Sequence, residues 1–233
     1  MTTPRNLTYP EPGIPGWMHL DSMHFLSGAV REARAERCIE IGSFFGRSAY
    51  AICTALAERS ASTSLVCVDR WSQALTEAYL ASPHMAEMFS WFDPSVRRSY
   101  AEACEGGSAR DAFEHTMGSF AFMRDRIEML QCDSEVLSQE LPADRRFDFA
   151  FVDGDHTEAG VRRDVLTVLG HLDPNATVVL DDCFDRFPGV VRFVDELVDH
   201  AGVESVDRHR GLVRLVVQDP ASLRAALRTT GSA

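Results

Sequence analysis

The sequence predicts an α/β protein whose doubly wound, mostly parallel sheet has seven strands and ends in an antiparallel hairpin. Short apolar runs alternate along the chain with segments of helical periodicity. Several of these runs end in an acidic residue, and a glycine-containing turn follows the first of them. Arg210 and Gly211 separate the last two runs, and such a two-residue turn is typical of a β-hairpin.

The predicted elements follow one another in a regular order. In the first strand, Cys38, Ile39 and Ile41 suit a strand that is buried on both faces of a parallel sheet. The other predicted strands are residues 65–68, 127–132, 147–152, 176–180, 203–209 and 212–217. Helical periodicity predicts helices over residues 22–36, 48–59, 161–172 and 188–201.

The size and composition of the chain indicate one domain over residues 1–233. Residues 1–20 are rich in proline and glycine, which predicts an N-terminal arm. Between Asp69 and Ile127 lie 58 positions (127 − 69), more than a crossover helix needs, so we expect a helical insertion over about residues 72–125. The aromatic residues and methionines of this insertion fit a cap over a ligand site, ordinary core or a dimer interface. They are Met85, Met88, Phe89, Trp91, Phe92, Phe113, Phe120 and Phe122.

Charge and composition also narrow the function. A net charge of −12 argues against nucleic acid as a partner, because no basic patch could release counterions from phosphates. All 23 basic residues are arginine, which excludes lysine as a Schiff base or general base. The six cysteines form no C-x-x-C pair, and no apolar stretch has the length of a signal peptide or membrane span. We therefore expect a cytoplasmic protein without a membrane partner. A homodimer that caps its own sites is a separate expectation.

The turn after the first strand predicts a ligand site. Glu40 precedes it, and Gly42 and Gly46 lie where the backbone turns sharply and a ligand can come close. The pattern is not G-x-G-x-x-G, so we do not expect a pyrophosphate cradle. Asp69 ends the second strand, where an acidic residue can bind a ribose diol. A nucleoside ligand without phosphates fits this combination.

Acidic residues also end the fourth and fifth predicted strands. FVDGDH and VVLDDC place Asp153, Asp181 and Asp182 on neighbouring loops at the carboxyl edge of the sheet. Three such carboxylates would repel one another, and a divalent cation would relieve the repulsion. Oxygen ligands favour Mg²⁺ or Mn²⁺.

The motif E-x-G-x-x-x-G-x-S, followed by a strand that ends in Asp69, resembles the S-adenosylmethionine (SAM) site of the class I methyltransferases, which have a Rossmann-like fold. The sheet of that family also ends in an antiparallel hairpin. The resemblance covers roughly Arg37 to Val217 and implies a set of cofactor-binding residues. These are Glu40, Gly42, Ser43, Gly46, Ser48, Asp69, Arg70, Trp71, Asp133, Ser134 and Asp153.

The separation of 28 residues between the two acidic loops (181 − 153) resembles the metal-dependent O-methyltransferases. The sugar O-methyltransferases of macrolide and related antibiotic pathways are closer still, because they carry V/I-D-G-D-H at this place. The resemblance implies Asp153, Asp181 and Asp182 as metal ligands and His156 as the general base. Catechol-type enzymes use a lysine where His156 stands, and this chain has none.

Simpler structural roles stay open for several of these residues. Asp133 and Asp155 also suit helix N-caps, with Glu158 completing a capping arrangement for Asp155. Asp181 and Asp182 suit strand-end caps, and His156 an exposed position in a first helical turn.

We expect a SAM- and Mg²⁺-dependent O-methyltransferase that methylates one hydroxyl of a vicinal diol, on a sugar of an oligosaccharide or glycosylated natural product. A catechol would fit the same site. The alternatives are an NAD(P)-dependent oxidoreductase, which would leave the acidic residues unexplained, and a SAM-binding protein that has lost catalysis.

Overall fold

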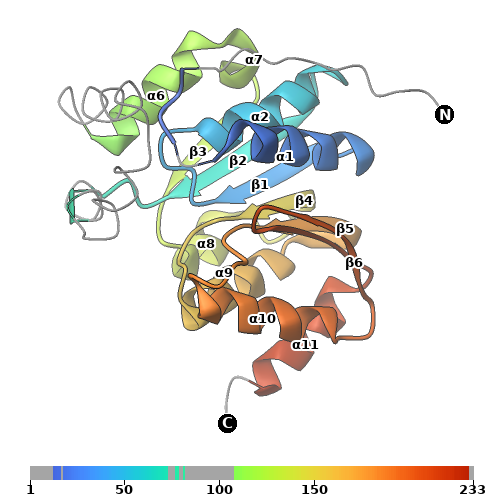
Figure 1. Cartoon of the computed structure of the whole chain (residues 1–233). Helices are drawn as coiled ribbons and strands as arrows, with labels where there is room; N and C mark the ends of the chain where they lie inside the picture. Colours follow the sequence, from blue (N-terminus) through green and yellow to red (C-terminus); the bar gives the residue numbers. More distant parts are fainter. Residues whose placement is uncertain (1–12, 17, 73–76, 79–80, 82–107, 231–233) are drawn as a thin grey trace.

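A computed structural model of the chain describes residues 13–16, 18–72, 77–78, 81 and 108–230. The fold is one seven-stranded sheet with the order β3-β2-β1-β4-β5-β7-β6 (Figure 1). The first five strands in the chain run parallel to one another, and β7 and β6 are antiparallel to their neighbours. The predicted fold class is thereby confirmed. The strands are β1 (Arg37–Ile41), β2 (Ser64–Asp69), β3 (Ile127–Gln131), β4 (Phe147–Val152), β5 (Leu172–Leu180), β6 (Val203–His209) and β7 (Leu212–Val217).

Helices cover both faces of the sheet (Figure 1). One face carries α1 (Leu20–Glu32), α2 (Arg47–Ala57), α6 (Ala109–Ser119) and α7 (Ala121–Arg124). The other carries α8 (Leu137–Glu140), which follows the short helix η1 (Ser134–Val136), together with α9 (Glu158–Leu169), α10 (Pro188–Val198) and α11 (Pro220–Thr230). Two apolar clusters form, one on each face, because each strand turns alternate side chains to opposite layers.

Several predicted boundaries are wrong by a few residues. The predicted helix over residues 161–172 begins three residues earlier and ends at Leu169, and Leu172 opens β5 instead. Leu172 pairs with Phe147, the register then shifts, and Thr177 pairs with Phe149. Asn175 has a φ of 62° within this irregular stretch, so the prediction mistook a bulged strand for a helix end. Helix α11 was not predicted.

The predicted insertion lies partly outside the described residues, including Met85, Met88, Phe89, Trp91 and Phe92. Its described part forms α6 and α7, which pack against the α2 side of the sheet. Phe113 is fully buried, and the rings of Phe120 and Phe122 lie 4.9 and 5.5 Å from that of Tyr50. Phe113 is therefore part of the core, and Phe120 and Phe122 are partly buried against it. The cap over a ligand site stays a prediction.

No helix in the described part of the chain has both the length and the apolar character that crossing a membrane requires.

The parallel register aligns the ends of the central strands. Ile41 pairs with Val68 on one side and with Val152 on the other, and Val152 pairs with Leu180. The loops that follow β1, β2, β4 and β5 therefore leave the sheet at one edge, where ligands bind in open parallel sheets.

Candidate functional site

The turn after β1 depends on two glycines for different reasons. Gly42 has a φ of +88°, and a Cβ there would lie 2.0 Å from the carbonyl oxygen of Asp153. Any larger residue would push the ends of β1 and β4 apart. Gly46, with a φ of +90°, is the N-cap of α2, and a Cβ there would lie 3.1 Å from the ring of Phe113. Between them Phe44 takes a φ of 44°, which is unusual for a bulky residue.

Glu40 supports this turn from below. It is fully buried, and one carboxylate oxygen accepts hydrogen bonds from Ser43 Oγ at 2.7 Å and Cys67 Sγ at 3.4 Å. Burial raises the pKa of Glu40 to about 7, although hydrogen bonds from Ser48, Ser43 and Cys67 act in the opposite direction. The structure therefore brings Glu40, Ser43 and Ser48 together, as a support beneath the turn.

Asp69 joins the turn to the end of β2. One of its oxygens accepts a hydrogen bond from the backbone N–H of Phe44 at 2.9 Å, and the other from that of Trp71 at 2.7 Å. The indole of Trp71 donates to the carbonyl of Phe44 at 2.8 Å and packs 5.0 Å from the ring of Phe113. Because Trp71 is only 3% exposed, its ring supports the loop from within the core.

Two cavities open at this edge of the sheet. The smaller, here called the β2–β3 cavity, has a volume of about 250 Å³ and includes the predicted residues Asp69, Arg70, Asp133 and Ser134 in its lining. Asp133 accepts a hydrogen bond from the N–H of Glu135 at 3.0 Å and lies 3.4 Å from the guanidinium of Arg70. The alternative role of Asp133 as an N-cap, of η1, is thus confirmed.

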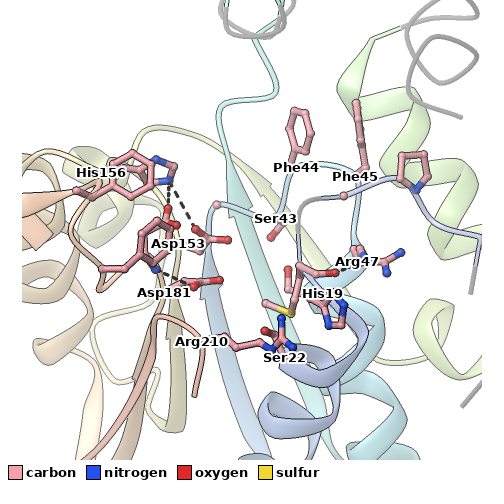
Figure 2. Close-up of a pocket in the computed structure, with 18 of the residues that line it drawn as sticks. His19, Ser22, Ser43, Phe44, Phe45, Arg47, Asp153, His156, Asp181 and Arg210 are labelled. Atoms are coloured by element: carbon pink, nitrogen blue, oxygen red, sulfur yellow. Dashed lines mark hydrogen bonds and ion pairs between the residues drawn. The ribbon is translucent and has the colours of Figure 1, made fainter. Parts of the chain in front are cut away.

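The larger cavity, here called the β4–β5 cavity, has a volume of about 460 Å³ (Figure 2). Ser43 and Ser48 line it on one side, and Asp153 and His156 on another. It shares Gly42, Phe44, Asp153 and His156 with the β2–β3 cavity, so the two spaces adjoin beside the glycine turn. A ligand bound in one cavity can therefore reach the other.

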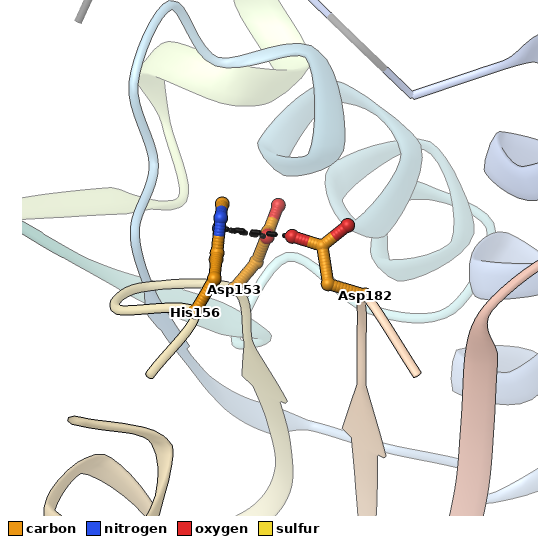
Figure 3. Close-up of side chains that lie close together, drawn as sticks. All are labelled: Asp153, His156 and Asp182. Carbon is orange, nitrogen blue, oxygen red and sulfur yellow. Dashed lines mark ion pairs between the residues drawn. The ribbon is translucent and has the colours of Figure 1, made fainter. Parts of the chain in front are cut away.

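Three side chains converge at this junction (Figure 3). His156 Nε2 lies 2.9 Å from an oxygen of Asp182 and 3.6 Å from an oxygen of Asp153. One ligand atom from each residue lies within 4.8 Å of the others, which is close enough for all three to share a cation. They form the one such group of three or more found among the residues that the structure describes.

His156 balances the charge of these carboxylates. Burial by itself lowers the pKa of His156, but the hydrogen bonds and charges of Asp153 and Asp182 outweigh it and raise that pKa to about 11. Burial raises the pKa of Asp153 to about 6, and the charge of Asp182 adds to this effect. An imidazolium thus relieves part of the repulsion for which the sequence alone suggested only a metal ion.

Asp181 lies beside this group and is not one of its members. Its Oδ1 accepts a hydrogen bond from the backbone N–H of Asp182 at 2.7 Å, although the residue still lines the β4–β5 cavity (Figure 2). Burial, with the charges of Asp153 and Asp182, raises the pKa of Asp181 well above its usual value. Asp182 itself has a φ of 60°, a conformation that aspartate tolerates better than most residues.

The predicted capping role of Asp155 is wrong. The N-cap of α9 is Thr157, whose hydroxyl accepts the hydrogen bond from the N–H of Gly160 at 3.0 Å. Asp155 instead accepts a hydrogen bond from the N–H of Thr157 at 2.9 Å, which closes the turn before the helix.

Sequence reasoning missed several residues of the site. Phe187 packs 4.7 Å from the His156 ring, and Phe184 is 40% exposed at the β4–β5 cavity. Arg47 donates to the carbonyls of Ile14 and Met18, both at 2.7 Å, and so holds the described part of the arm against this cavity. Phe184 and Phe187 follow the D-D motif closely enough for a cavity role to be suspected, whereas nothing local to Arg47 indicates its distant partners.

Comparisons with known proteins agree with this fold. An O-methyltransferase from Bacillus cereus, solved with S-adenosylhomocysteine (SAH), is similar in structure, with a TM-score of 0.54, 18% identity, and coverage of 85% of this chain and 81% of that one. A methyltransferase from Geobacter sulfurreducens has a TM-score of 0.56 and 15% identity, with coverage of 88% of this chain and 80% of that one. An SAH-bound methyltransferase from Podospora anserina has a TM-score of 0.52 and 16% identity, with coverage of 84% of this chain and 78% of that one.

These structural similarities establish the fold. No curated protein matches the chain in sequence. A family model described as a methyltransferase domain matches residues 39–183, which is more than half of the chain and includes the glycine turn, Asp69 and both acidic loops. The chain therefore belongs to the methyltransferase-domain family.

Proposed function

We propose that the chain is a SAM-dependent O-methyltransferase that uses Mg²⁺ or Mn²⁺ to methylate one hydroxyl of a vicinal diol. The observation that carries this proposal is the junction of the two cavities at Asp153 and His156. A cofactor space and an acceptor space must meet at the transferred methyl group, and here they meet beside a cluster of acidic residues.

SAM fits the β2–β3 cavity and its junction with the β4–β5 cavity. Asp69, at the end of β2, can accept hydrogen bonds from ribose hydroxyls, and Asp133 and Ser134 line the same cavity, where they can bind the adenine. The glycine turn leaves the backbone open to close approach at Gly42. Glu40, Gly46 and Trp71 act on the ligand indirectly, because they shape the turn.

The acidic cluster fits a divalent cation. Asp153 and Asp182 offer carboxylate oxygens from two different strands, with Asp181 beside them and His156 within 4.8 Å. Carboxylates suit Mg²⁺ and Mn²⁺. A cation bound here would hold two neighbouring acceptor oxygens and lower the pKa of the hydroxyl to be methylated.

A bound cation would offset the charges of Asp153 and Asp182, which otherwise keep His156 protonated. His156 would then accept the hydroxyl proton as a neutral imidazole. It lies at the junction and is held by Asp182 at 2.9 Å, which fixes the direction of its ring. Phe187 packs against the ring at 4.7 Å and limits its movement. Methyl transfer requires in-line placement of the acceptor oxygen. A base with a fixed direction favours this placement, because the hydroxyl must point toward it.

The acceptor proposal extends to sugar hydroxyls. The β4–β5 cavity combines polar groups, such as Ser22 and Arg210, with the rings of Phe184 and Phe187. A sugar presents both hydroxyls and an apolar ring face, so it fits this mixture, and a catechol is the alternative. Family membership leaves an NAD(P)-dependent oxidoreductase without support.

A second mechanism has an observation of its own. The His156–Asp182 pair resembles the histidine–carboxylate pairs that serve as general bases without metal. Because the pKa of His156 is about 11 without a cation, an enzyme of this type would work at alkaline pH, and removal of divalent ions would leave its rate unchanged.

A methyl-transfer screen tests the proposed function. The wild-type chain is incubated with SAM and panels of sugar diols, catechols and matched mono-alcohols, with and without EDTA. Mass spectrometry then measures the masses of the products. We expect one added methyl group on a diol, loss of this product with EDTA, and recovery when Mg²⁺ is returned. If SAM binds and no acceptor gains a methyl group, the chain is a SAM-binding protein without this activity.

A further inference from the structure

Asp164 is a buried carboxylate that the proposed chemistry does not use. It lies on α9, is 2% exposed and lines the β2–β3 cavity. One of its oxygens accepts a hydrogen bond from the hydroxyl of Ser134 at 2.5 Å, and the other from the backbone N–H of Asp155 at 3.3 Å. Asp164 therefore joins the loop after β3 to the loop after β4.

The loop after β4 approaches the Asp164 carboxylate so closely at Gly154 that a side chain would not fit there. A Cβ at Gly154 would lie 2.5 Å from Oδ2 of Asp164 and 3.2 Å from a side-chain carbon of Ile41. The backbone of Gly154 is not in the left-handed region, so close approach explains the glycine better than conformational freedom does. The glycine of the D-G-D-H segment thus makes room for a residue ten positions later.

Arg163, the residue before Asp164 on α9, connects the same two loops nearer the protein surface. Arg163 lies 2.8 Å from a carboxylate oxygen of Glu135, in η1, and 3.5 Å from one of Asp155. The inner connection is the stronger of the two, because Asp164 is buried whereas Arg163 is part-exposed. Two consecutive residues of one helix therefore connect the same pair of loops.

These two loops carry the two halves of the proposed function. The first provides Asp133 and Ser134 to the β2–β3 cavity, and the second carries Asp153 and His156 on either side of the bond that Asp164 accepts. We propose that Asp164 is a positioning residue that sets the SAM-binding loop and the cation-binding loop relative to each other. This inference rests on the proposed function, since it assigns SAM and a cation to those loops.

Asp164→Asn gives the test. An amide keeps the size of the side chain but removes its charge, so both hydrogen bonds weaken: the oxygen can still accept from Asp155, and the nitrogen can only donate to the hydroxyl of Ser134. We expect Kd values for SAM and for Mn²⁺, measured separately by calorimetry, to rise about tenfold or more, as loss of a hydrogen bond to a charged group implies. The Mn²⁺ measurement is decisive, because Asp164 has no hydrogen bond or ion pair to Asp153, His156 or Asp182 among the described contacts.

Val165→Ala is the matched control. Val165 is 3% exposed on the same helix and belongs to the core, so its truncation destabilises the fold without touching either loop. We expect it to lower the melting temperature and leave both Kd values unchanged. Wild-type affinities in Asp164→Asn, or equal losses in Val165→Ala, would overturn the proposal.

Ser134→Ala keeps the proposal testable if Asp164→Asn does not fold. It removes the connection to the first loop and also a hydroxyl that lines the β2–β3 cavity, so we expect weaker SAM binding and unchanged Mn²⁺ binding. Wild-type SAM affinity in this variant would contradict the positioning role. A wild-type chain that binds neither SAM nor Mn²⁺ would instead refute the proposed function itself.

Discussion

His156 Nε2 lies 2.9 Å from Oδ2 of Asp182, although the two residues come from loops after different strands. The contact exists because β4 and β5 are adjacent and parallel, with Val152 opposite Leu180. It places an imidazole and two carboxylates at the point where the two cavities adjoin (Figure 3).

Asp182→Ala should remove most of the activity. The substitution deletes a proposed cation ligand and the partner of His156, so we expect kcat/KM to fall about a hundredfold or more, with SAM affinity nearly unchanged. Asp181→Ala is the comparison, because Asp181 accepts a hydrogen bond from the backbone N–H of Asp182 and lies outside the cluster. We expect a smaller fall in kcat/KM for Asp181→Ala. Equal falls for the two variants in initial-rate assays would show that Asp181 contributes to the cation site as much as Asp182.

His156→Ala should slow catalysis without releasing the cation. Loss of a general base reduces the rate by about a hundred- to ten-thousand-fold. Because Asp153 and Asp182 remain, we expect Mn²⁺ affinity to fall by much less than kcat. Single-turnover rates and Mn²⁺ titrations check the two parts separately, and a normal turnover rate would show that the base lies elsewhere.

Asp69→Ala should weaken SAM binding. The substitution removes the proposed ribose contact and leaves the N–H groups of Phe44 and Trp71 without their acceptor. We expect the Kd for SAM to rise about ten- to hundredfold, as loss of hydrogen bonds to a charged group implies. Calorimetry with SAM measures this directly. An unchanged Kd would place the ribose away from β2.

Glu40→Gln should change how stability depends on pH. The folded-state pKa of Glu40 is raised from 4.5 to about 7, so the folded protein holds this proton where the unfolded chain releases it. Glu40 therefore makes the wild type less stable as pH rises from about 5 to 8, by roughly 2–3 kcal/mol. Urea unfolding at both pH values checks this. The difference in stability, variant minus wild type, should increase toward pH 8, and a constant difference would contradict the shift.

Much of the fold could be predicted from the sequence because its signals are local. The apolar runs of β1, β2 and β4, the Arg210-Gly211 turn and Pro188 at the start of α10 each depend on a few neighbouring residues. The first four residues of β5 and the whole of α11 escaped prediction for physical reasons. The bulge around Asn175 interrupts the period of β5, and α11 follows the last strand, where no motif directed attention to it.

The candidate site divides in the same way. Asp153, Asp181 and Asp182 were predicted as neighbours, with His156 beside them, because parallel strands bring their carboxyl ends to one edge. The cluster contains Asp153, His156 and Asp182 and leaves Asp181 beside it. The inward position of Trp71 and the place of Asp164 beneath the loops depend on packing between distant segments, which no spacing rule reports. The homodimer and the cytoplasmic location stay predictions.

Titration of the wild-type chain with Mn²⁺, followed by electron paramagnetic resonance, tests most directly whether this cluster holds a divalent cation. We expect one site per chain, lost in a variant with both Asp153→Asn and Asp182→Asn and retained in Asp155→Asn, whose carboxylate lies outside the cluster. Equal Mn²⁺ binding by the double variant and the wild type would contradict the proposed site.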